Sequence, residues 1–583
     1  MLRKNRSLMK AAACLAVLCT ASASHAQTSF ALGGIQSDSG HSVAFDADDN
    51  IFLTGIARQA VDFDPSPGVA ELNFGGSNVF FVASYTSTGA LRYVVPIPGI
   101  STTLPETGLA VDGAGNVYVS GSFSGVVDFD PGAGEELLNS ANGRLFLASY
   151  DTAGGLRFAF NIGFGPPWYE AGKGLYADDD GNLWLTGTFS GTTDFDPTES
   201  EFFLQSNGTS DVFVAGYTST GGFRFAVAVG GVLVDRGLDI AVDSAGNSYV
   251  TGAFRDTVDF DPSAGTVELT ANETNEDFFL ASYTDGGGFR YAVAAGGSNT
   301  DIGWGVDVDA SGNAFVTGSF SGTADFDPSP GILELTSEGV NNDAFIASYD
   351  PGGALRFAFG LGGPNPDEGR ALSVDQSGNI VVTGSFRNGF DFDPGPDDFT
   401  LNTLAPDSFL ASYTNTGAFL SADIFLPLTS SAVTVNEIAL MQNDTPALVG
   451  TFSGPAGVDL DLGGTDLSTP SNGANDLFFT SRTTDADTDG DGVSDDNDNC
   501  TLLPNADQRN TNGDRFGNVC DPDLNNDGIV NIVDLGALRA VFFTADADAD
   551  FNGDGAVNVV DLGVLRSFFF APPGPSGLQA PTP

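Results

Sequence analysis

A ten-residue segment that recurs about every 66 residues is the feature that most constrains the fold. One copy, over residues 243–252, reads Asp-Ser-Ala-Gly-Asn-Ser-Tyr-Val-Thr-Gly. The fifth residue of this segment is the marker asparagine, found at Asn50, Asn116, Asn182, Asn247, Asn313 and Asn379, and in a seventh, degenerate copy it is replaced by Thr445. A second motif, Asp-Phe-Asp-Pro, keeps the same period and begins at Asp62, Asp128, Asp194, Asp259, Asp325 and Asp391. Two motifs in one register over seven copies indicate a repeat protein.

Each repeat alternates apolar and polar residues and is divided by turns rich in Gly, Asn and Asp. Short runs of this kind predict four antiparallel strands per repeat. Seven four-stranded blades form a closed ring, which removes the exposed edges that an open array of sheets would leave. The sequence therefore predicts an all-β fold, a seven-bladed β-propeller over residues 27–483.

The two ends of the repeat region predict how the ring closes. Residues 29–34 match the last strand of a repeat, whereas residues 477–482 match the third strand. The seventh repeat thus lacks its last strand, and the N-terminal segment has a spare one. We expect residues 28–34 to complete the seventh blade without a covalent link, which gives a monomeric propeller.

The recurring signature resembles that of secreted bacterial seven-bladed β-propeller repeat proteins over about residues 28–483. This resemblance implies a fold and an extracellular setting, but a fold does not by itself supply a function.

Residues 1–26 have the features of a secretory signal peptide. Four basic residues precede an apolar run, and Ser-His-Ala ends at Ala26. This pattern predicts cleavage before Gln27 and a location outside the cytoplasm, secreted or at the cell surface of a bacterium. No later apolar run approaches the roughly 20 residues that a membrane-spanning helix needs.

The chain is strongly acidic, with 21 basic and 76 acidic residues. Loss of the four basic residues of the leader would leave 17 basic residues against the same 76 acidic ones. Such a charge argues against binding to nucleic acid or to anionic membranes and favours multivalent cations, of which Ca²⁺ is the natural candidate. The alternative is that the acidic residues only keep a secreted ring soluble.

The scarcity of histidine and lysine limits the chemistry. Without the leader, His41 is the only histidine and Lys173 the only lysine. A zinc site built from several imidazoles is therefore excluded, and a Ser-His-Asp triad could use His41 alone. Hydrolysis of glycosidic bonds by two carboxylates remains possible, although the sequence singles out no pair.

The residues nine positions before each marker residue form one candidate ligand site. They are chemically unlike one another: His41, Thr107, Lys173, Leu238, Trp304, Arg370 and Asn436. We expect this register to encircle one mouth of the central channel, with an acidic rim formed three positions earlier by Asp38, Glu170, Asp235, Asp301 and Asp367. Trp168 could add a stacking surface for an extracellular glycan, and a protein is the other expected ligand. The alternative is that these are ordinary loop residues.

Two other recurring features indicate structural roles. An arginine recurs in the last strand at Arg92, Arg157, Arg224, Arg290 and Arg356, where we expect it to bridge to a carboxylate of the neighbouring blade. We expect the Asp-Phe-Asp-Pro motif to cap a turn with a buried Phe as its anchor, and surface calcium binding is its alternative.

After residue 483 the composition changes to an Asp-rich segment. A loop that starts at Asp487 has an EF-hand-like spacing of oxygen ligands, with a Gly at its sixth position: Asp487, Asp489, Asp491, the Val493 carbonyl, Asp495 and Asp498. Residues 484–522 resemble a thrombospondin type 3 repeat. A second, poorer loop would use Asn510, Asn512, Asp514, Asn518 and Asp521. Cys500 and Cys520 are the only cysteines outside the leader, and we expect them to form a disulfide.

Residues 523–570 contain a duplicated unit of one calcium loop and one amphipathic helix. The predicted ligands of the two loops are Asp523, Asn525, Asp527, the Ile529 carbonyl, Asn531 and Asp534, and then Asp550, Asn552, Asp554, the Ala556 carbonyl, Asn558 and Asp561. The Asp at position twelve and the missing entering helix resemble a dockerin type I domain. Residues 571–583, rich in Pro and Gly, are expected to be disordered.

The resemblance to dockerins implies docking to a cohesin-like protein through loop positions ten and eleven. These positions hold apolar pairs here: Ile532, Val533, Val559 and Val560. Apolar residues at these positions indicate another cohesin class, or else helix faces that pack together.

These features favour a secreted, calcium-binding, non-catalytic binding or adhesion protein with a docking module. The main alternative is an extracellular polysaccharide-degrading enzyme, a hydrolase or lyase, tethered by the same module. A scaffold of the cell envelope without a small ligand is a third possibility.

Overall fold

The chain divides into two compact units, residues 1–482 and 483–583, in a computed structural model. The structure describes residues 28–481, 499–570 and 573–574, apart from 35, 67, 101–106, 164–170, 199, 272–274, 298, 330, 339–340, 388, 396–398, 402, 404–406, 426–432, 454–474, 501–502, 504–508, 513–515, 527–528 and 554. The predicted signal peptide, Trp168, the loop at residues 487–498, Asp514, Asp527, Asp554 and most of the predicted tail lie outside these residues.

Within the described residues, the first unit contains seven four-stranded antiparallel sheets, as the repeat predicts. Blade one contains β2 (Ser39–Phe45), β3 (Ile51–Asp62), β4 (Glu71–Tyr85) and β5 (Leu91–Pro98). Blade two contains β6 (Gly108–Val111), β7 (Val117–Asp128), β8 (Leu137–Tyr150) and β9 (Leu156–Ile162), and blade three contains β10 (Ala171–Ala177), β11 (Leu183–Phe189), β14 (Asp211–Tyr217) and β15 (Phe223–Val229).

The remaining blades repeat this order. Blade four contains β16 (Arg236–Val242), β17 (Ser248–Phe254), β20 (Asp277–Tyr283) and β21 (Phe289–Ala295), and blade five contains β22 (Ile302–Val308), β23 (Ala314–Ser321), β26 (Asn342–Tyr349) and β27 (Leu355–Leu361). Blade six contains β28 (Glu368–Val374), β29 (Ile380–Phe386), β32 (Asp407–Tyr413) and β33 (Phe419–Ile424), and blade seven contains β34 (Val433–Leu440), β35 (Pro446–Phe452), β36 (Asp476–Ser481) and β1 (Ser29–Leu32).

The N-terminal strand β1 completes the seventh blade by pairing with β36, which confirms the predicted closure. The register places Phe30 opposite Phe479 and Leu32 opposite Leu477. The Phe30 ring also lies 4.7 Å from the ring of Tyr85 in blade one. A strand from the start of the chain therefore joins the last blade to the first.

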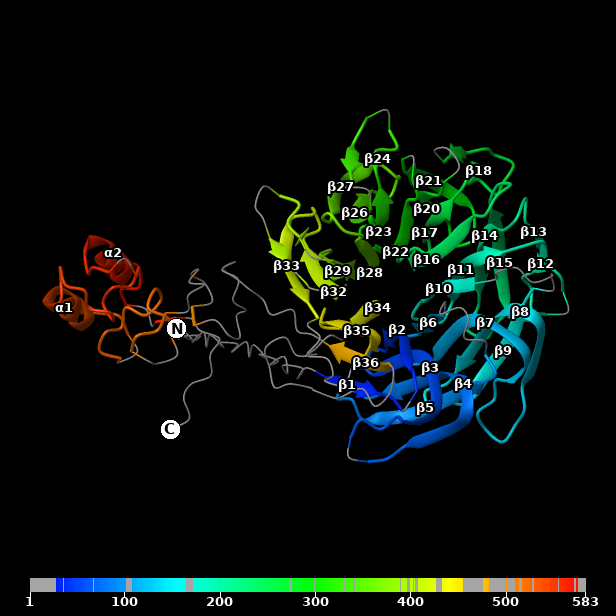
Figure 1. Cartoon of the computed structure of the whole chain (residues 1–583), viewed down its shortest axis with the longest axis horizontal. Helices are drawn as coiled ribbons and strands as arrows, with labels where there is room; N and C mark the ends of the chain where they lie inside the picture. Colours follow the sequence, from blue (N-terminus) through cyan, green and yellow to red (C-terminus); the bar gives the residue numbers. More distant parts are fainter. Residues whose placement is uncertain are drawn as a thin grey trace, which may run out of the picture. The chain divides into compact units, whose positions relative to one another are not determined.

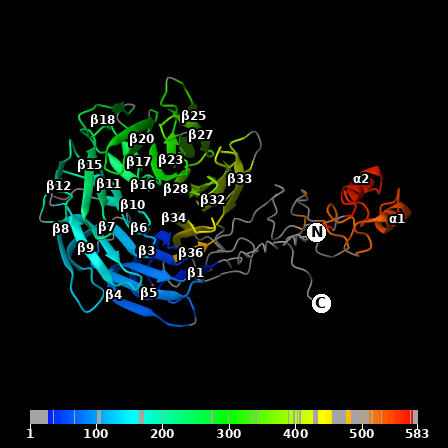
Figure 2. The ribbon, with the colours of Figure 1, turned by 180° about the vertical axis from the view of Figure 1, so that it is seen from behind.

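The innermost strands β2, β6, β10, β16, β22, β28 and β34 follow one another around the centre of the ring (Figure 1), and the last contacts the first. The outer strands β5, β9, β15 and β33 lie at the periphery in the opposite view (Figure 2). Apolar side chains between adjacent blades form most of the core, because each sheet is too small to bury both of its faces alone.

The recurring Asp-x-x-Gly-Asn segment is the turn between the first two strands of a blade. In blade four, Oδ1 of Asp243 accepts hydrogen bonds from the backbone N–H of Ala245 and Asn247, and the Asn247 side chain donates to Oδ2 at 2.8 Å. Gly246 has φ +79°, a conformation that glycine adopts without steric cost. The turn therefore needs Asp, Gly and Asn at these spacings.

The Asp-Phe-Asp-Pro motif caps an outer hairpin, as expected. In blade four, Oδ1 of Asp259 accepts hydrogen bonds from the N–H of Asp261 and Val267, and Phe260 is fully buried. The short hairpins of this kind are β12–β13 (Thr192–Asp194, Phe203–Gln205), β18–β19 (Thr257–Asp259, Glu268–Thr270), β24–β25 (Thr323–Asp325, Glu334–Thr336) and β30–β31 (Phe390–Asp391, Thr400–Leu401).

The recurring arginines join neighbouring blades, although in most cases not through a carboxylate as predicted. The Arg157 guanidinium lies over the Tyr118 ring and donates to the Ser219 carbonyl of the next blade at 2.9 Å. Arg224 alone of the five pairs with a carboxylate across the blades among the described contacts, that of Asp285. The turn that faces each arginine presents backbone carbonyls, so the carbonyl is the usual acceptor.

The second unit contains two helices, α1 (Ile532–Ala540) and α2 (Val559–Ser567), within its described residues. Both begin with the same capping box, in which Asn531 or Asn558 is the N-cap and Asp534 or Asp561 bonds back to it. Val530, Leu538, Phe551, Val557 and Leu565 form a small core. A disulfide joins Cys500 and Cys520, as predicted.

None of the helices in the described part of the chain is long and apolar enough to cross a membrane.

Candidate functional site

The predicted ligand register coincides with a β-bulge on the innermost strand. The pairing of β2 with β3 shifts between Gly40 and Ser42, so His41 is the extra residue. The same shift occurs at Leu238, Trp304, Arg370 and Asn436. A bulge changes the direction of a side chain relative to its neighbours. The sequence register therefore selects a structurally equivalent position in these blades.

The side chains at this position do different things. Thr107 and Leu238 are buried, and the Asn436 amide donates to the Gly40 carbonyl of the first blade at 2.7 Å. Arg370 is partly exposed and pairs with Glu368 at 3.2 Å. These residues do not form one ring of ligand contacts, because three of them support the fold.

His41 is held in its neutral form. Its Nε2 lies 2.9 Å from the Ser39 hydroxyl, and burial lowers its pKa to about 4. Lys173 lies within β10 next to a bulge. Trp168, which we expected to add a stacking surface, lies outside the described residues. The side chain of Lys173 lies outside them as well.

The prediction of an acidic rim is wrong for the four carboxylates that the structure describes. Asp38, Asp235, Asp301 and Asp367 are all buried. The Asp235 carboxylate accepts hydrogen bonds from the N–H of Gly231 at 2.7 Å and of Arg255 at 3.0 Å, and the other three bond in the same way. Each aspartate thus ties the entry of one blade to the end of the preceding blade, so it is not available at the mouth.

The centre of the propeller contains a cavity of about 230 Å³ to which all seven innermost strands contribute. The lining residues lie eight, seven and six positions before the marker residue. Those seven positions before it are apolar, such as Val43 and Ile240, and most of the others are small, such as Ser42 and Ala241, apart from Tyr176 and three acidic residues: Asp239, Asp307 and Glu437. None of the described lining residues is basic. The channel therefore suits a small polar or cationic ligand rather than an anion.

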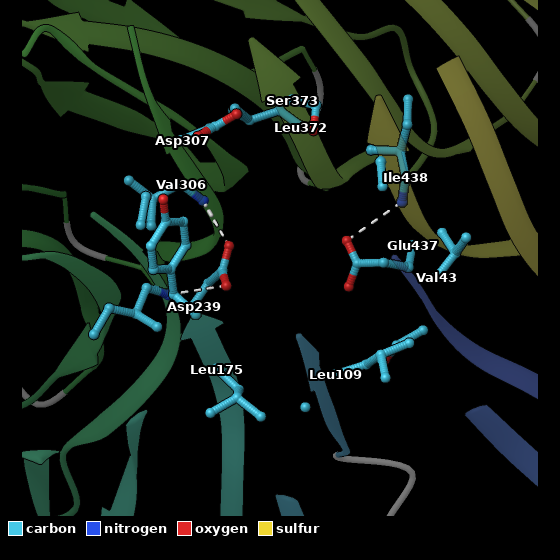
Figure 3. A pocket seen from close by; sticks show the side chains of 16 residues that line it. Val43, Leu109, Leu175, Asp239, Val306, Asp307, Leu372, Ser373, Glu437 and Ile438 are labelled. Carbon is cyan, nitrogen blue, oxygen red and sulfur yellow. Dashed lines mark hydrogen bonds between the residues drawn. The ribbon is translucent and has the colours of Figure 1, made fainter. Parts of the chain in front are cut away.

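The acidic side chains lie on two sides of the channel. Figure 3 shows the Asp239 and Glu437 carboxylates projecting toward the open centre from opposite walls. The Asp239 carboxylate accepts hydrogen bonds from the N–H of Ile240 and, across the blade boundary, of Val306, both at 2.9 Å. Glu437 accepts from its neighbour Ile438 at 3.3 Å. The backbone thus orients both carboxylates.

Asp307 has an altered acidity. Burial, with a contribution from the charge of Asp239, raises its pKa to about 7, although the N–H groups of Val308 and Val374 bond to it and oppose this shift. Burial and the Asp307 charge also raise the pKa of Tyr176 to about 12. The channel therefore contains a carboxyl group that can take up a proton near neutral pH.

The sequence contained a signal for this acidic set. In the registers eight and six positions before the marker, Asp239, Asp307 and Glu437 are the acidic residues, and all the others except Tyr176 are Gly, Ala or Ser. An acidic residue in a register of small residues stands out once that register is known to face the axis. The structure was needed to show that this register faces the axis.

In the second unit, both dockerin-like loops bury their first and last predicted ligands. Asp523, Asp534, Asp550 and Asp561 are each less than 4% exposed. In the loop that begins at Asp550, here called the second loop, Asp561 Oδ1 accepts hydrogen bonds from the N–H of Phe551 and Asn552. Its Oδ2 accepts a hydrogen bond from the N–H of Asn558. The last position thus folds back onto the start of the loop, which is the closure that a calcium loop needs.

The residues of the second loop fit a calcium ion. Asp550 Oδ2 accepts from the N–H of Gly555 at 2.9 Å and lies 3.5 Å from the Arg509 guanidinium, whereas its buried Oδ1 accepts no hydrogen bond. An unpaired buried carboxylate oxygen is costly, and a cation is its natural partner. No group of three or more His, Cys, Asp or Glu among the described residues is arranged to hold a metal, and the fifth-position residues Asp527 and Asp554 lie outside them.

The poorer loop, predicted from Asn510 to Asp521, differs from a calcium cage, because its described side chains bond to other protein groups. Asn518 Oδ1 accepts from the N–H of Thr511 at 2.9 Å, and its Nδ2 donates to the Ala547 carbonyl at 2.9 Å. Asn512 donates to Asp521 at 2.9 Å. Three of the predicted ligands, Asn512, Asn518 and Asp521, are thus engaged with protein groups, and their calcium binding stays a prediction.

The four predicted docking residues are exposed at the starts of the two helices. Ile532 is 75% and Val559 is 70% exposed, and Val533 and Val560 are at least half exposed. They therefore do not pack against one another as a core within the unit, which was one of the two alternatives for these apolar pairs.

Comparison with known proteins assigns the chain to no family. No family of known proteins matches the chain. An uncharacterized WD repeat-containing protein of Acanthamoeba polyphaga mimivirus is 23% identical over 510 residues, which cover 72% of this chain and 36% of that protein. The chain thus spans about a third of the length of this relative.

Solved structures with a similar fold differ in what they do. One is a polysaccharide lyase, an ulvan lyase, with a TM-score of 0.36 and 11% identity over 72% of this chain and 93% of that one. Another is the PQQ domain of a pyranose dehydrogenase from Coprinopsis cinerea, with a TM-score of 0.31 and 9% identity over 77% and 94%. Likenesses at this level carry no functional argument.

Proposed function

We propose that this chain is a secreted, calcium-binding, non-catalytic binding protein, whose propeller presents the ligand site and whose C-terminal unit docks to a protein partner. The observation that carries the proposal is the pair of equivalent loop–helix units in the second unit. Each buries two carboxylates and exposes an apolar pair at the start of a capped helix. Exposed apolar pairs on a small unit are typical of contact surfaces.

Calcium would supply charge compensation for the buried carboxylates. Asp523 and Asp534 in one loop, and Asp550 and Asp561 in the other, would hold it with the side-chain oxygens of Asn525, Asn531, Asn552 and Asn558. Chelation would leave these buried charges uncompensated, so the helices would lose their N-terminal anchor. Docking is therefore expected to require calcium.

The docking proposal is tested by the binding of the full chain to a panel of immobilised cohesin modules, measured with calcium and with EDTA. We expect calcium-dependent binding that Ile532→Asp and Val559→Asp together abolish. Leu420→Asp is the matched control, because Leu420 is a half-exposed apolar residue of β33 in the propeller. Absence of binding to every module, or binding that the double variant retains, would contradict this docking mode.

On the propeller, we assign the ligand to the central channel and the mouth beside it. The described lining of the channel is acidic and contains no basic residue, and Trp304 and Arg370 lie at bulges on two of its strands. A glycan or a small cationic ligand fits this chemistry. Binding to a glycan array should fall when Asp239→Asn and Glu437→Gln are combined, and the variant with Val126→Ala, an exposed site on β7, is the control.

A second candidate, a polysaccharide-degrading enzyme, is favoured by one observation. Asp239 and Glu437 face each other across a cavity, and the pKa of Asp307 is raised to about 7, so one carboxyl group could act as an acid beside an ionised one. The cavity of about 230 Å³ is smaller than the roughly 300–1,000 Å³ of most ligand pockets, which favours binding over catalysis on a polymer. Turnover of a polysaccharide that Glu437→Gln abolishes would establish the enzyme instead.

A further inference from the structure

Each of the two dockerin-like loops is preceded by a backbone carbonyl that accepts hydrogen bonds from residues outside the loop, and the two carbonyls lie at equivalent positions. In each, the supported group is the backbone carbonyl three residues before the first loop position. This carbonyl is that of Cys520 for the first loop and that of Ala547 for the second. The N–H of Gly574 donates to the Cys520 carbonyl at 3.0 Å. The internal repeat thus extends to the supported carbonyls, although the groups that donate to them differ.

Three side chains converge on the Ala547 carbonyl. Arg509 Nη2 donates at 3.1 Å, Thr511 Oγ1 at 3.2 Å and Asn518 Nδ2 at 2.9 Å. We call Arg509, Thr511 and Asn518 the clamp. Arg509 Nη1 also donates to the carbonyl of Asp550, the first residue of the second loop, at 2.8 Å. The clamp therefore holds the backbone that leads into this loop.

Hydrogen bonds also join the three clamp residues to one another. The N–H of Asn518 donates to the Arg509 carbonyl at 2.8 Å, and the N–H of Thr511 donates to Asn518 Oδ1 at 2.9 Å. Asn518 thus uses its backbone and both ends of its amide within this arrangement. It contacts the second calcium loop as a support and is not arranged as a ligand of an ion.

The disulfide connects the clamp to the first loop. The segment that Cys500 and Cys520 close contains the clamp, and Cys520 is the residue whose carbonyl anchors the first loop. Both cysteines are buried, and the N–H of Gly517 bonds to the Asn499 carbonyl at 2.8 Å, which ties the two ends of the segment together. One closed segment therefore touches the entry of both loops.

The group that the clamp positions is suited to a cation. Asp550 is 3% exposed; its Oδ1 accepts no hydrogen bond, whereas Oδ2 accepts from the N–H of Gly555 and lies 3.5 Å from Nη2 of Arg509, so the clamp also contacts the carboxylate itself. Groups that orient a metal ligand without touching the metal commonly change affinity by 10- to 100-fold. The position of Asp550 therefore depends on residues outside its own loop.

We propose that Arg509, Thr511 and Asn518, which lie between the disulfide-bonded Cys500 and Cys520, are positioning residues that support the second calcium loop from outside. Through Cys520 the two loops become mechanically dependent on each other. This inference rests on the proposed calcium binding, and it assigns these three residues to the second loop rather than to an ion of their own.

Calorimetric titration of the calcium-depleted full chain with Ca²⁺ tests it. Asp550→Asn first identifies the binding event of the second loop, because it removes the oxygen that has no partner. Asn518→Ala, which changes no charge, is then expected to weaken that event by roughly tenfold and to leave the other events unchanged. Thr511→Val should act in the same direction by a smaller factor.

A further variant tests the contribution of the disulfide. Replacement of Cys500 and Cys520 by Ser should weaken the second-loop event as well.

The outcomes distinguish the two levels of the proposal. If Asp550→Asn leaves the isotherm of the wild-type chain unchanged, the calcium assignment fails and the inference fails with it. If Asp550→Asn removes a binding event but Asn518→Ala and Thr511→Val keep wild-type affinity, the clamp alone is overturned.

Discussion

The Asp239 carboxylate of blade four accepts a hydrogen bond from the backbone N–H of Val306 in blade five at 2.9 Å. One blade further on, Asp307 bonds in the same manner to the N–H of Val374 in blade six at 2.8 Å. Two of the three acidic residues of the channel thus also join successive blades. A side chain that lines the central cavity here is at the same time part of a contact between adjacent blades.

The buried carboxyl groups predict that the propeller is more stable in weak acid than at pH 8. Burial raises the pKa of Asp38, Asp211, Asp235 and Asp301 to about 6, and that of Asp307, Asp343, Asp367 and Asp407 to about 7. A folded-state pKa above the unfolded value of 3.8 adds stability that is complete below about pH 4. This stability is lost as the pH rises through 6 to 7.

We therefore expect the Tm of the propeller to be higher at pH 5.5 than at pH 8 by on the order of 5 °C. All three tryptophans, Trp168, Trp184 and Trp304, lie in the repeat region, so tryptophan fluorescence follows this unit alone. Asp343→Asn should reduce the difference between the two pH values. A Tm that rises from pH 5.5 to pH 8 would contradict the raised pKa values.

The closing strand predicts that Phe30 stabilises the whole propeller. Its ring is buried and lies 4.7 Å from Tyr85 and 5.2 Å from Phe479. Phe30→Ala should lower the free energy of unfolding by about 3–5 kcal/mol, because the cavity opens at the joint between the last and first blades. Urea unfolding followed by tryptophan fluorescence measures this loss. Leu420→Ala, at a half-exposed site, should change it by less than about 0.5 kcal/mol.

Removal of an inter-blade arginine should lower the free energy of unfolding by less than Phe30→Ala does. Arg157 donates to the Tyr118 hydroxyl, the Ser149 hydroxyl and the Ser219 carbonyl, and it lies over the Tyr118 ring. Arg157→Ala should cost about 1–3 kcal/mol in the same unfolding assay. Arg157→Lys should recover little of this, because an ammonium group cannot make these contacts together. A loss no larger than that of Arg387→Ala, at an exposed site, would show that the contact is not needed.

Two glycines of blade four should respond differently to the same substitution. A Cβ at Gly252 would lie 1.9 Å from the Arg236 carbonyl oxygen, whereas a Cβ at Gly286 would meet no atom within 4 Å. Gly252→Ala is expected to destabilise the propeller by more than about 3 kcal/mol. Gly286→Ala should be neutral or stabilise it by up to about 1 kcal/mol. The ranking of the two midpoints in urea checks this; equal midpoints would contradict the close strand approach.

The repeat made most of the propeller predictable. The period of the marker residue at Asn247 and its equivalents supplied the number of blades, and the spare strand at residues 29–34 supplied the closure. The buried Phe260 and the turn at Asp243 followed from local rules, because hydrogen bonds within a few residues decide them. The Cys500–Cys520 disulfide followed from the count of cysteines outside the leader.

The site was less predictable. Asp38 and Asp235 carry the same charge as surface residues, and the sequence does not say that backbone N–H groups of an adjacent blade surround them. The sequence placed Trp304 and Arg370 at equivalent positions of their repeats. Whether each side chain supports the fold or faces a ligand depends on contacts between blades.

By itself, the sequence determined the features that arise from neighbours along the chain: the repeat, the turns, the order of strands and the calcium-loop spacing. Only the tertiary structure decided that Asp239, Asp307 and Glu437 share one channel and that Asn518 supports the loop of Asp550. The reason is physical. Burial, charge and direction of a side chain depend on groups that are far away in the chain, and ring closure brings those groups together.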